Sequence, residues 1–351
     1  MVVRALLVRG AMRVALITFT TLLAMGAGCA TERPEDANAG DGGPDAPGPG
    51  TVLDDDWHPT HAPAMALAAD GAHVYYATYD RIERVAVGGG AAELLYTIPP
   101  PADGVLLSRV TSLYLGPSEL VFVLAAQGES STTKSLMSVP RGGGAATLLA
   151  QSGDVRAFLG VAFDAEYVYY SSFTSIARVP RGGGTARFVG QSDQSVRYWV
   201  FSPVVTADAI TWAEGGELFR MPKSSIGGEG TAFASLPGVG AIIAREPAYV
   251  VALSDQIAFQ GPPSAAVVVD PTTGSVGPVI ELPGITTISP VEQTVAATPD
   301  HLYTATLDGL WQSARTGGAP TKVLDGAVAA VAAGPDGVYV ATQTAVARVA
   351  P

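Results

Sequence analysis

A pattern that recurs every 36 to 52 residues is the feature that most constrains how this chain can fold. In each copy an acidic turn precedes an apolar or aromatic strand. A short turn and a further strand follow. This strand contains Arg-Val in the three clearest copies, and a Gly-rich run comes after it in the first two of them. These clearest copies cover residues 69–90, 163–184 and 335–349. The strand after the acidic turn is centred, along the chain, near Tyr75, Phe122, Tyr169, Thr211, Val251, Tyr303 and Tyr339.

Each copy offers four short strands, and the first is small and apolar, as in residues 64–67 and 328–331. Small residues suit a crowded inner strand around a central axis. Four strands in each repeat of about 40–50 residues are typical of a β-propeller. Stacking the sheets face to face buries their apolar faces, which accounts for 48% hydrophobic residues without helices. The sequence therefore predicts an all-β, seven-bladed propeller, with six blades as the next choice and a run of separate sandwiches as the structural alternative.

Closure of the ring can also be read from the sequence. The last copy stops at Val349, after its third strand, so one outer strand is missing. Residues 51–53, before the first copy, form a spare strand of the right kind. Pairing it with residues 347–349 would remove the exposed edges, so we expect a folded body over residues 51–351.

The repeat resembles a known group of propellers. Its pattern, Asp followed by Tyr-Val-Tyr-Tyr and then Ile-x-Arg-Val-Pro, is similar to the YWTD and NHL-type repeats over about 300 residues. YWTD propellers usually have six blades and a Trp after the Tyr, where this chain has Tyr75-Tyr76 and Tyr169-Tyr170. The resemblance implies the fold alone, because unrelated functions share propellers.

The N-terminal residues have the features of a secretory signal. Residues 1–28 contain three arginines and no acid, then an apolar run over 14–25 and small residues up to 28. The run is shorter than the roughly 20 residues that span a bilayer. The single cysteine of the chain, Cys29, follows at once, and this resembles the bacterial lipobox, although Gly26 stands where Leu is usual. The resemblance implies a lipoprotein whose Cys29 carries fatty acids such as palmitate. The alternative is an ordinary signal peptide followed by a chance cysteine.

Residues 29–50 have no large apolar side chain and are rich in Gly, Pro and acids. Such a segment cannot bury surface, so we expect a disordered tether between the lipid and the folded body. This organisation predicts a protein of the bacterial cell envelope, anchored at the outer membrane or on the periplasmic face.

Charge and cysteine content exclude several classes of partner and site. The chain has 20 Lys and Arg residues against 32 Asp and Glu residues, a net charge of −12. This charge repels phosphate backbones, so nucleic acid is not an expected partner. One cysteine allows no internal disulfide and no Cys-based zinc site.

The densest group of functional residue types lies at residues 54–61. Asp54, Asp56, His58 and His61 could ligate a divalent metal, since carboxylate and imidazole are common ligands of Zn²⁺. The alternative is a polar connection whose acids continue the tether. No cofactor other than this possible metal is expected.

Two further motifs recur in the repeat. The runs 88–90, 142–144 and 182–184 are all glycine, and strands on both sides favour hairpin turns over phosphate loops. Four arginines share one repeat position, and we expect them to pair with the turn acids Asp70, Asp164, Asp208 and Asp336 rather than to bind an anion. These arginines are Arg84, Arg178, Arg220 and Arg348.

The function that the sequence favours is non-catalytic binding or scaffolding of a protein, a peptide or a glycan. Residues 99–101 and 130–133 lengthen turns, which are places where propellers recognise partners. The alternative is an extracytoplasmic hydrolase or lyase for sugars or lactones that uses channel carboxylates. Gly-x-Ser-x-Gly, the usual motif of a serine nucleophile, is absent.

Overall fold

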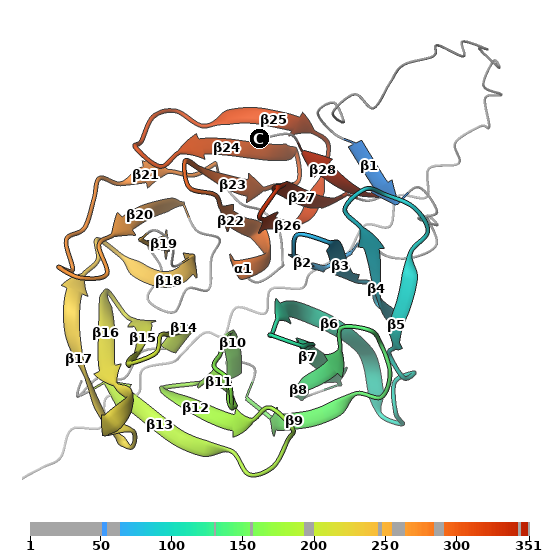
Figure 1. The fold of residues 1–351 in the computed structure, drawn as a ribbon, viewed down its shortest axis with the longest axis horizontal. Helices are drawn as coiled ribbons and strands as arrows, with labels where there is room; N and C mark the ends of the chain where they lie inside the picture. The colour runs from blue at the N-terminus through green and yellow to red at the C-terminus, as the bar shows by residue number, and fades with distance from the viewer. Residues whose placement is uncertain are drawn as a thin grey trace, which may run out of the picture. The chain divides into compact units, whose positions relative to one another are not determined.

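Short antiparallel strands arranged around a common centre make up the molecule (Figure 1). The computed structural model describes residues 51–54, 64–129, 131–154, 157–192, 200–244, 248–254, 264–283, 291–342 and 345–349. These residues belong to one compact unit that extends from Ala46 to Pro351. Among them, helix is confined to α1 (Val291–Thr294) and a three-residue 3-10 helix, Lys223–Ser225. The prediction of an all-β propeller is confirmed.

Five sheets have four strands each, and in four of these sheets the strands follow in chain order. The first sheet contains β2 (Ala66–Ala69), β3 (His73–Ala77), β4 (Arg81–Ala86) and β5 (Glu93–Thr97). The second contains β6 (Val105–Leu115), β7 (Glu119–Gly128), β8 (Thr132–Pro140) and β9 (Thr147–Ser152).

The other three four-stranded sheets follow later in the chain. One contains β18 (Val239–Ala244), β19 (Tyr249–Ser254), β20 (Ala265–Val269) and β21 (Ile280–Glu281). The next contains β22 (Val295–Ala297), β23 (His301–Ala305), β24 (Gly309–Ala314) and β25 (Thr321–Asp325). The last contains β26 (Val328–Gly334), β27 (Gly337–Thr342), β28 (Val346–Val349) and β1 (Thr51–Asp54).

The remaining eight strands form one continuous sheet. Its first half contains β10 (Ala157–Phe163), β11 (Tyr167–Ser172), β12 (Ser175–Pro180) and β13 (Arg187–Ser192). Its second half contains β14 (Val200–Val205), β15 (Ala209–Glu214), β16 (Glu217–Pro222) and β17 (Gly228–Ser235). The order is β10-β11-β12-β13-β17-β16-β15-β14, so the two outer strands join the halves.

The predicted number of separate blades is therefore wrong. Instead of seven four-stranded blades, or six, the structure has five four-stranded blades and one eight-stranded sheet. The physical reason is a parallel pairing of β13 with β17, in which Gly190 lies opposite Gly228. Gly230 permits the packing beneath it, since a Cβ there would meet the ring of Trp212 at 2.2 Å. The period of a repeat shows where strands recur, but it does not show where outer strands pair.

Aromatic side chains of the second strand in each repeat lie in the core between neighbouring sheets. Tyr75 of β3 packs in one cluster with Phe122 of β7, and Tyr76 packs in another with Tyr339 of β27. All four side chains are buried. Alternate residues of a strand face opposite sides of its sheet, so each aromatic pair reaches both neighbours. The apolar strands read from the sequence are thus the source of the core.

The acidic turn and the tyrosine after it form one local unit. Asp164 Oδ1 accepts hydrogen bonds from the backbone N–H groups of Glu166 and Tyr167, at 2.9 and 2.8 Å. The Tyr169 hydroxyl donates to Asp164 Oδ2 at 2.8 Å. Asp70 and Tyr75 repeat this arrangement with the same spacing of five residues. The aspartate therefore closes the turn while the tyrosine ring stays buried.

The glycine runs form hairpin turns, as predicted. Gly89 and Gly90 have φ angles of 84° and 118° in the turn between β4 and β5. The corresponding glycines of the second and third runs have φ angles between 84° and 130°. Only glycine adopts such angles without steric cost, which explains the residue type.

The outer edge of the last sheet is covered by β1. Thr51 pairs with Arg348 and Val52 with Ala347, in antiparallel register. A strand from the N-terminal end of the described chain thus becomes the fourth strand of a sheet whose other strands are at the C-terminal end. Without it, the edge of β28 would expose unpaired N–H and C=O groups.

We predict that a chain starting at Asp55 is less stable than one starting at Ala46. Loss of β1 removes one strand pairing, so the free energy of unfolding should fall by about 2 kcal/mol. Urea denaturation followed by tryptophan fluorescence measures the difference. Equal stability of the two chains would show that the pairing of β1 contributes nothing to the fold.

Candidate functional site

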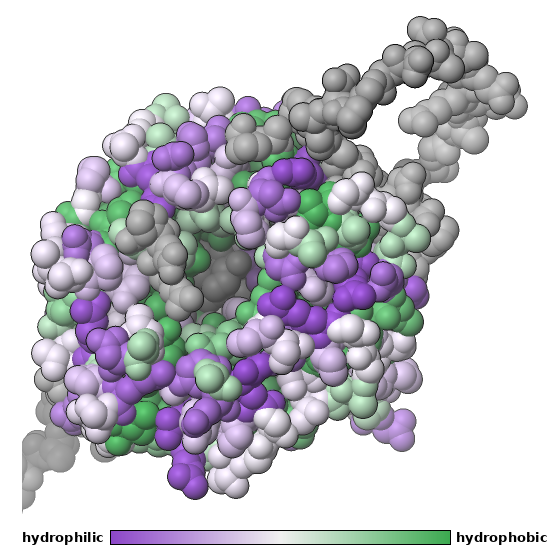
Figure 2. All heavy atoms as spheres, viewed as in Figure 1, coloured by the Kyte–Doolittle hydropathy of each residue, from purple (hydrophilic) through white to green (hydrophobic). Residues whose placement is uncertain are grey.

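A cavity of about 680 Å³ lies at the centre of the ring. Its lining residues belong to the C-terminal ends of the inner strands and the turns after them. These strands are β2, β6, β10, β14, β18, β22 and β26. Figure 2 shows the ring hollowed at its centre, with hydrophobic surface around the hollow. The cavity therefore opens towards the acidic turns of the repeat.

Strand edges, rather than one face of a sheet, form the wall of the cavity. Consecutive residues line it, for example 160–163 of β10 and 242–244 of β18. Neighbouring side chains of a strand point to opposite faces, so only an edge can present successive residues to one space. Each inner strand pairs with one neighbour only, so its other edge faces the cavity. The cavity-side edge of each inner strand therefore carries backbone groups without a strand partner, and Gln293 bonds to two of these groups, the Leu67 N–H and the Leu113 carbonyl.

Gln293 of α1 reaches across the centre of the ring. Its Oε1 accepts a hydrogen bond from the Leu67 N–H of β2 at 2.7 Å, and its side chain is 2% exposed. Its Nε2 donates to the Leu113 carbonyl of β6 at 3.5 Å. One buried amide therefore links α1, which precedes β22, to the inner strands β2 and β6 of two other blades. Gln293 also belongs to the lining, so it contributes a polar group to the cavity.

The inner strands β10 and β14 approach each other closely beside the cavity. A Cβ on Gly160 would lie 2.4 Å from the Cα of Ser202, so no other residue fits at position 160. Ser202 has a φ angle of 43°, in the left-handed region that non-glycine residues rarely adopt. Both residues lie at irregularities of their strand pairing. The strain is localised where two inner strands meet.

Ion pairs between successive repeats surround the mouth of the cavity. Arg141, which follows β8, binds Asp70 in the turn between β2 and β3, with Nη1 and Oδ2 2.9 Å apart. Arg141 Nε also donates to the Gly116 carbonyl at 3.1 Å. Arg141 lines the cavity, but its guanidinium is already engaged.

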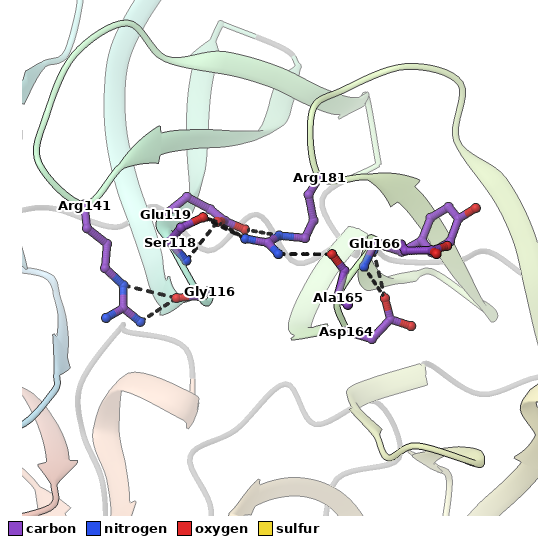
Figure 3. A network of polar contacts seen from close by, with 9 residues as sticks. Gly116, Ser118, Glu119, Arg141, Asp164, Ala165, Glu166 and Arg181 are labelled. Carbon is purple, nitrogen blue, oxygen red and sulfur yellow. Dashed lines mark hydrogen bonds and ion pairs between the residues drawn. The ribbon is translucent and has the colours of Figure 1, made fainter.

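The next two repeats continue the same arrangement. Arg181 holds Glu119 through two hydrogen bonds, of which Nε to Oε1 is 2.7 Å, and donates to the Ala165 carbonyl (Figure 3). Lys223 Nζ lies 2.8 Å from Asp164 Oδ2. Each cation therefore binds the acidic turn of the repeat before it, which fixes neighbouring repeats relative to one another.

These contacts shift the pKa values of the acids. Burial raises the pKa of Asp164, but hydrogen bonds from Lys223, two backbone N–H groups and Tyr169 outweigh it and lower the pKa to about 2. Burial also raises the pKa values of Asp70 and Glu119. Hydrogen bonds and the neighbouring arginines outweigh burial, so both pKa values are lowered. The three carboxylates are therefore charged at neutral pH and hold the rim together.

Apolar side chains, strand edges and a few polar side chains, among them Gln293, form the lining of this cavity. Among the described residues that line it, none is Asp, Glu or His. The channel carboxylates that a hydrolase or lyase would need are thus not found in the described lining. The size lies within the roughly 300–1,000 Å³ of ligand-binding cavities.

The pairing predicted for the repeated arginines is wrong in three cases of four. Arg84 pairs with Glu93 at 2.7 Å, on the neighbouring outer strand. Arg178 lies over the Tyr167 ring at 4.1 Å and Arg220 over the Phe233 ring at 4.2 Å. Only Arg348 lies beside its turn acid, Asp336, at 4.0 Å. The cause is side-chain direction. Arg84 donates to the Arg141 carbonyl and Arg220 to the Pro271 carbonyl, both in the following repeat, whereas the cations directly after the third strands β8 and β16 reach the turn of the preceding repeat.

The sequence carried a signal for the true partners. A cation follows Pro140, Pro180 and Pro222, directly at the end of a third strand. That position lies on the same end of the ring as the acidic turns. The predicted pairing assigned the turn acids to the arginines within the third strands instead of to this position.

The predicted metal ligands fall almost entirely outside the described residues. Asp56, His58 and His61 lie in the range 55–63, and Asp54 is described only as the last residue of β1. Cys29 also lies outside the described residues. Within the part of the chain that is described, no group of three His, Cys, Asp or Glu side chains could hold a metal ion. The metal site and the lipidation site stay predictions.

Known proteins resemble this chain in fold alone. No family model matches the sequence, and no curated protein matches it. One similar solved structure is the extracellular domain of BT4673 from B. thetaiotaomicron, with a TM-score of 0.55 and 7% identity, covering 85% of this chain and 40% of that one. Another is PorZ, a surface component of the type-IX secretion system of Porphyromonas gingivalis, with a TM-score of 0.51 and 12% identity. The match covers 86% of this chain and 39% of PorZ.

This chain spans about two fifths of the length of those two proteins. The likeness supports the β-propeller and leaves the YWTD or NHL type of the repeat open. Within the described ranges, no helix has the length and hydrophobicity needed to cross a bilayer.

We predict that Asp164→Asn destabilises the protein at pH 7 by about 1 kcal/mol, a value reduced for solvent screening. Asn keeps an oxygen for the backbone N–H groups but loses the ion pair with Lys223. The folded pKa of about 2 lies below the ordinary 3.8, so the stabilisation is present above pH 3.8 and lost as pH falls towards 2. Denaturation at several pH values measures it.

The matched control is Asp103→Asn, at an exposed position with no ion pair among the described residues. It should change stability little at any pH. A difference between wild type and Asp164→Asn that stays constant from pH 7 to pH 2 would contradict the role assigned to the carboxylate.

Proposed function

We propose that this protein is a lipid-anchored module of the bacterial cell envelope that binds a partner without catalysis. The partner would be a peptide or a protein segment, and an apolar part of it would enter the central cavity. The observation that carries the proposal is a cavity of about 680 Å³ whose wall combines apolar side chains with strand edges. The function rests on this cavity and not on the fold, which serves many purposes.

The strand edges favour a peptide as the ligand. The cavity-side edge of an inner strand has no neighbouring strand in its sheet, so it can bond with the main chain of an incoming segment, as in β-strand addition. The side chains beside them, such as Val161, Val204 and Val331, are apolar and suit an apolar residue of that segment. A glycan is less suited, because its hydroxyl groups need polar partners when buried.

Binding is also favoured over the enzyme alternative by the chemistry of the lining. General acid–base catalysis needs a titratable group near its working pH beside the substrate. The charged group in the described lining is Arg141, and its guanidinium holds Asp70 and Gly116. An arginine engaged in this way orders the mouth of the cavity and transfers no proton.

The location rests on separate support. The signal-like residues 1–28, Cys29 and the acidic tether 30–50 together suit a protein that is exported and anchored by lipid. The similar solved structures are described as an extracellular domain and a bacterial surface component. In this proposal the tether carries the ring away from the membrane, where its cavity meets envelope partners.

We predict that Ala333→Trp abolishes peptide binding, because the indole would occupy the mouth of the cavity that Ala333 lines. Peptides selected from a displayed library of random dodecapeptides on the wild-type protein are the probe. Fluorescence polarisation should show at least about a tenfold loss of affinity for the variant.

Ala314→Trp is the matched control, since Ala314 is also half-buried at the end of a strand but does not line the cavity. It should bind the selected peptides as the wild type does. Selected peptides that bind Ala333→Trp and the wild type equally would overturn the proposed use of the cavity.

We predict that Cys29→Ala releases the protein from the membrane fraction, because the acyl chains that would anchor it have no other cysteine. Expression in a bacterial host, fractionation and metabolic labelling with a palmitate analogue provide the measurement. Wild type should be labelled and sediment with membranes, as should the control Thr31→Ala. An unlabelled wild type, or a Cys29→Ala variant that sediments equally, would refute the anchor.

A further inference from the structure

Gln293 shows how an amide group binds between two inner strands of the ring. Its carboxamide accepts a hydrogen bond from the Leu67 N–H of β2 and donates one to the Leu113 carbonyl of β6. Both strands end at the mouth of the cavity, and Leu67 and Leu113 are the first of their residues to line it. The bridged pair therefore lies at the inner end of the cavity, where the side chain of Gln293 is buried.

The hydrogen bonds of two turns show which residues of β2 and β6 correspond. The turns after these strands close with the same backbone bond, in which the N–H of Asp70 or Gly116 donates to the carbonyl three residues later, at 3.0 and 2.9 Å. Leu67 and Leu113 each lie three residues before that N–H, so they occupy equivalent positions. Residues of an antiparallel pair alternate between bonding to the partner strand and facing away from it. Leu67 and Leu113 are of the second kind, so their backbone groups face the axis.

Ala69 and Leu115 lie two residues further along the same strands, so their backbone groups face the axis as well. Both residues line the cavity and are half-buried. No residue of the described chain bonds to the Ala69 N–H or to the Leu115 carbonyl. The step along the strands is about 7 Å towards the mouth. A donor and an acceptor without a partner thus repeat, nearer the mouth, the pair that Gln293 bridges.

We propose that the Ala69 N–H and the Leu115 carbonyl form a subsite for a carboxamide, the side-chain group of a glutamine or asparagine in the partner peptide. The ligand oxygen would accept a hydrogen bond from Ala69, and the ligand nitrogen would donate one to Leu115. Gln293 makes the same two bonds one step deeper. The inference rests on the proposed function and names the chemical group that the cavity selects.

The donor and acceptor of the subsite discriminate against charged groups. A carboxylate has no proton to donate to the Leu115 carbonyl, and an ammonium or guanidinium group cannot accept a bond from the Ala69 N–H. Burying a charge beside the apolar lining without a full set of partners is also costly. A hydroxyl group would have to make both bonds through one oxygen atom. A carboxamide supplies the two bonds from two atoms and carries no charge.

The spacing of β2 and β6 favours a side chain over a main chain at this subsite. The Cα atoms of the two strands approach each other to within 8 Å. A strand inserted between them would need about 10 Å, twice the spacing of neighbouring strands. A single amide at the tip of a side chain needs no such gap, as Gln293 shows. The main chain of the same peptide can still pair with the edge of another inner strand.

The experiment compares three small molecules of similar shape on the wild-type protein: butanamide, butanoate and 2-pentanone. Among them butanamide alone both donates and accepts hydrogen bonds. NMR of the backbone amide of Ala69 follows a titration up to about 200 mM, since so small a ligand binds weakly. Butanamide should bind at least about fivefold tighter than the other two, and the Ala69 resonance should shift until the site is saturated.

Ala69→Pro removes the N–H of the subsite and should reduce the affinity for butanamide to that for 2-pentanone. The proline costs no bond between strands, because this N–H faces away from β3. Ala297→Pro is the matched control. Ala297 directly precedes the equivalent turn bond after β22, lines the cavity and is half-buried. Its variant should keep the preference for butanamide.

A second variant tests the subsite without proline. Gln293→Ala leaves the deeper pair, the Leu67 N–H and the Leu113 carbonyl, without its internal amide. Butanamide should therefore raise the melting temperature of this variant more than that of the wild type, because ligands that bind the folded state stabilise it. 2-Pentanone should give no such additional rise.

Three results would overturn the inference. They are equal or undetectable binding of butanamide and 2-pentanone to the wild type, an Ala69→Pro variant that keeps the preference seen in Ala297→Pro, and no additional rise for Gln293→Ala. The proposed function fails separately, when selected peptides bind Ala333→Trp as tightly as the wild type. Selected peptides that need the cavity but contain neither glutamine nor asparagine would contradict the carboxamide subsite and leave the proposed function standing.

Discussion

Each sheet of this molecule has two apolar faces, and burying both of them is the constraint from which the rest of the structure follows. If the sheets were stacked in an open row, each middle sheet would bury both faces against its two neighbours, but the first and last sheets would each leave one apolar face exposed. A ring removes those ends. The buried tyrosines show the constraint at work, since Tyr75 and Tyr76 of β3 pack in the clusters on opposite sides of their sheet. The strand β1 then covers the edge of the last sheet.

The ring also produces the features that bear on binding. Because every blade directs its first strand to the axis, the strand edges converge there and leave a cavity instead of a packed core. Ion pairs at the mouth, such as Arg181 with Glu119, join one repeat to the turn of the one before it. The cavity is therefore a consequence of the architecture.

Sequence alone predicted those parts of the structure that depend on local chemistry. The acidic turns, the tyrosine five residues after Asp70 and Asp164, and the glycine hairpins were all readable, because each is fixed by residues within one repeat. What could not be read depends on contacts between repeats. The pairing of β13 with β17 requires two outer strands to approach at Gly190 and Gly228. The partners of Asp70 and Asp164 come from residues 71 and 59 positions away in the sequence, respectively. The cavity itself has no motif, since backbone edges form most of its wall.

Closure by β1 is the claim on which the ring depends, and a disulfide tests it most directly. Val52 and Ala347 are paired across β1 and β28. Antiparallel partners have Cα atoms about 4.5–5.5 Å apart, within the range that a disulfide spans. A chain starting at Ala46 has no other cysteine, so Val52→Cys with Ala347→Cys reports on this pair alone. The account predicts a monomer with an intramolecular disulfide under mild oxidation, and no such bond when Val52→Cys is combined with Ala314→Cys. Free thiols or intermolecular dimers in the first variant would contradict it.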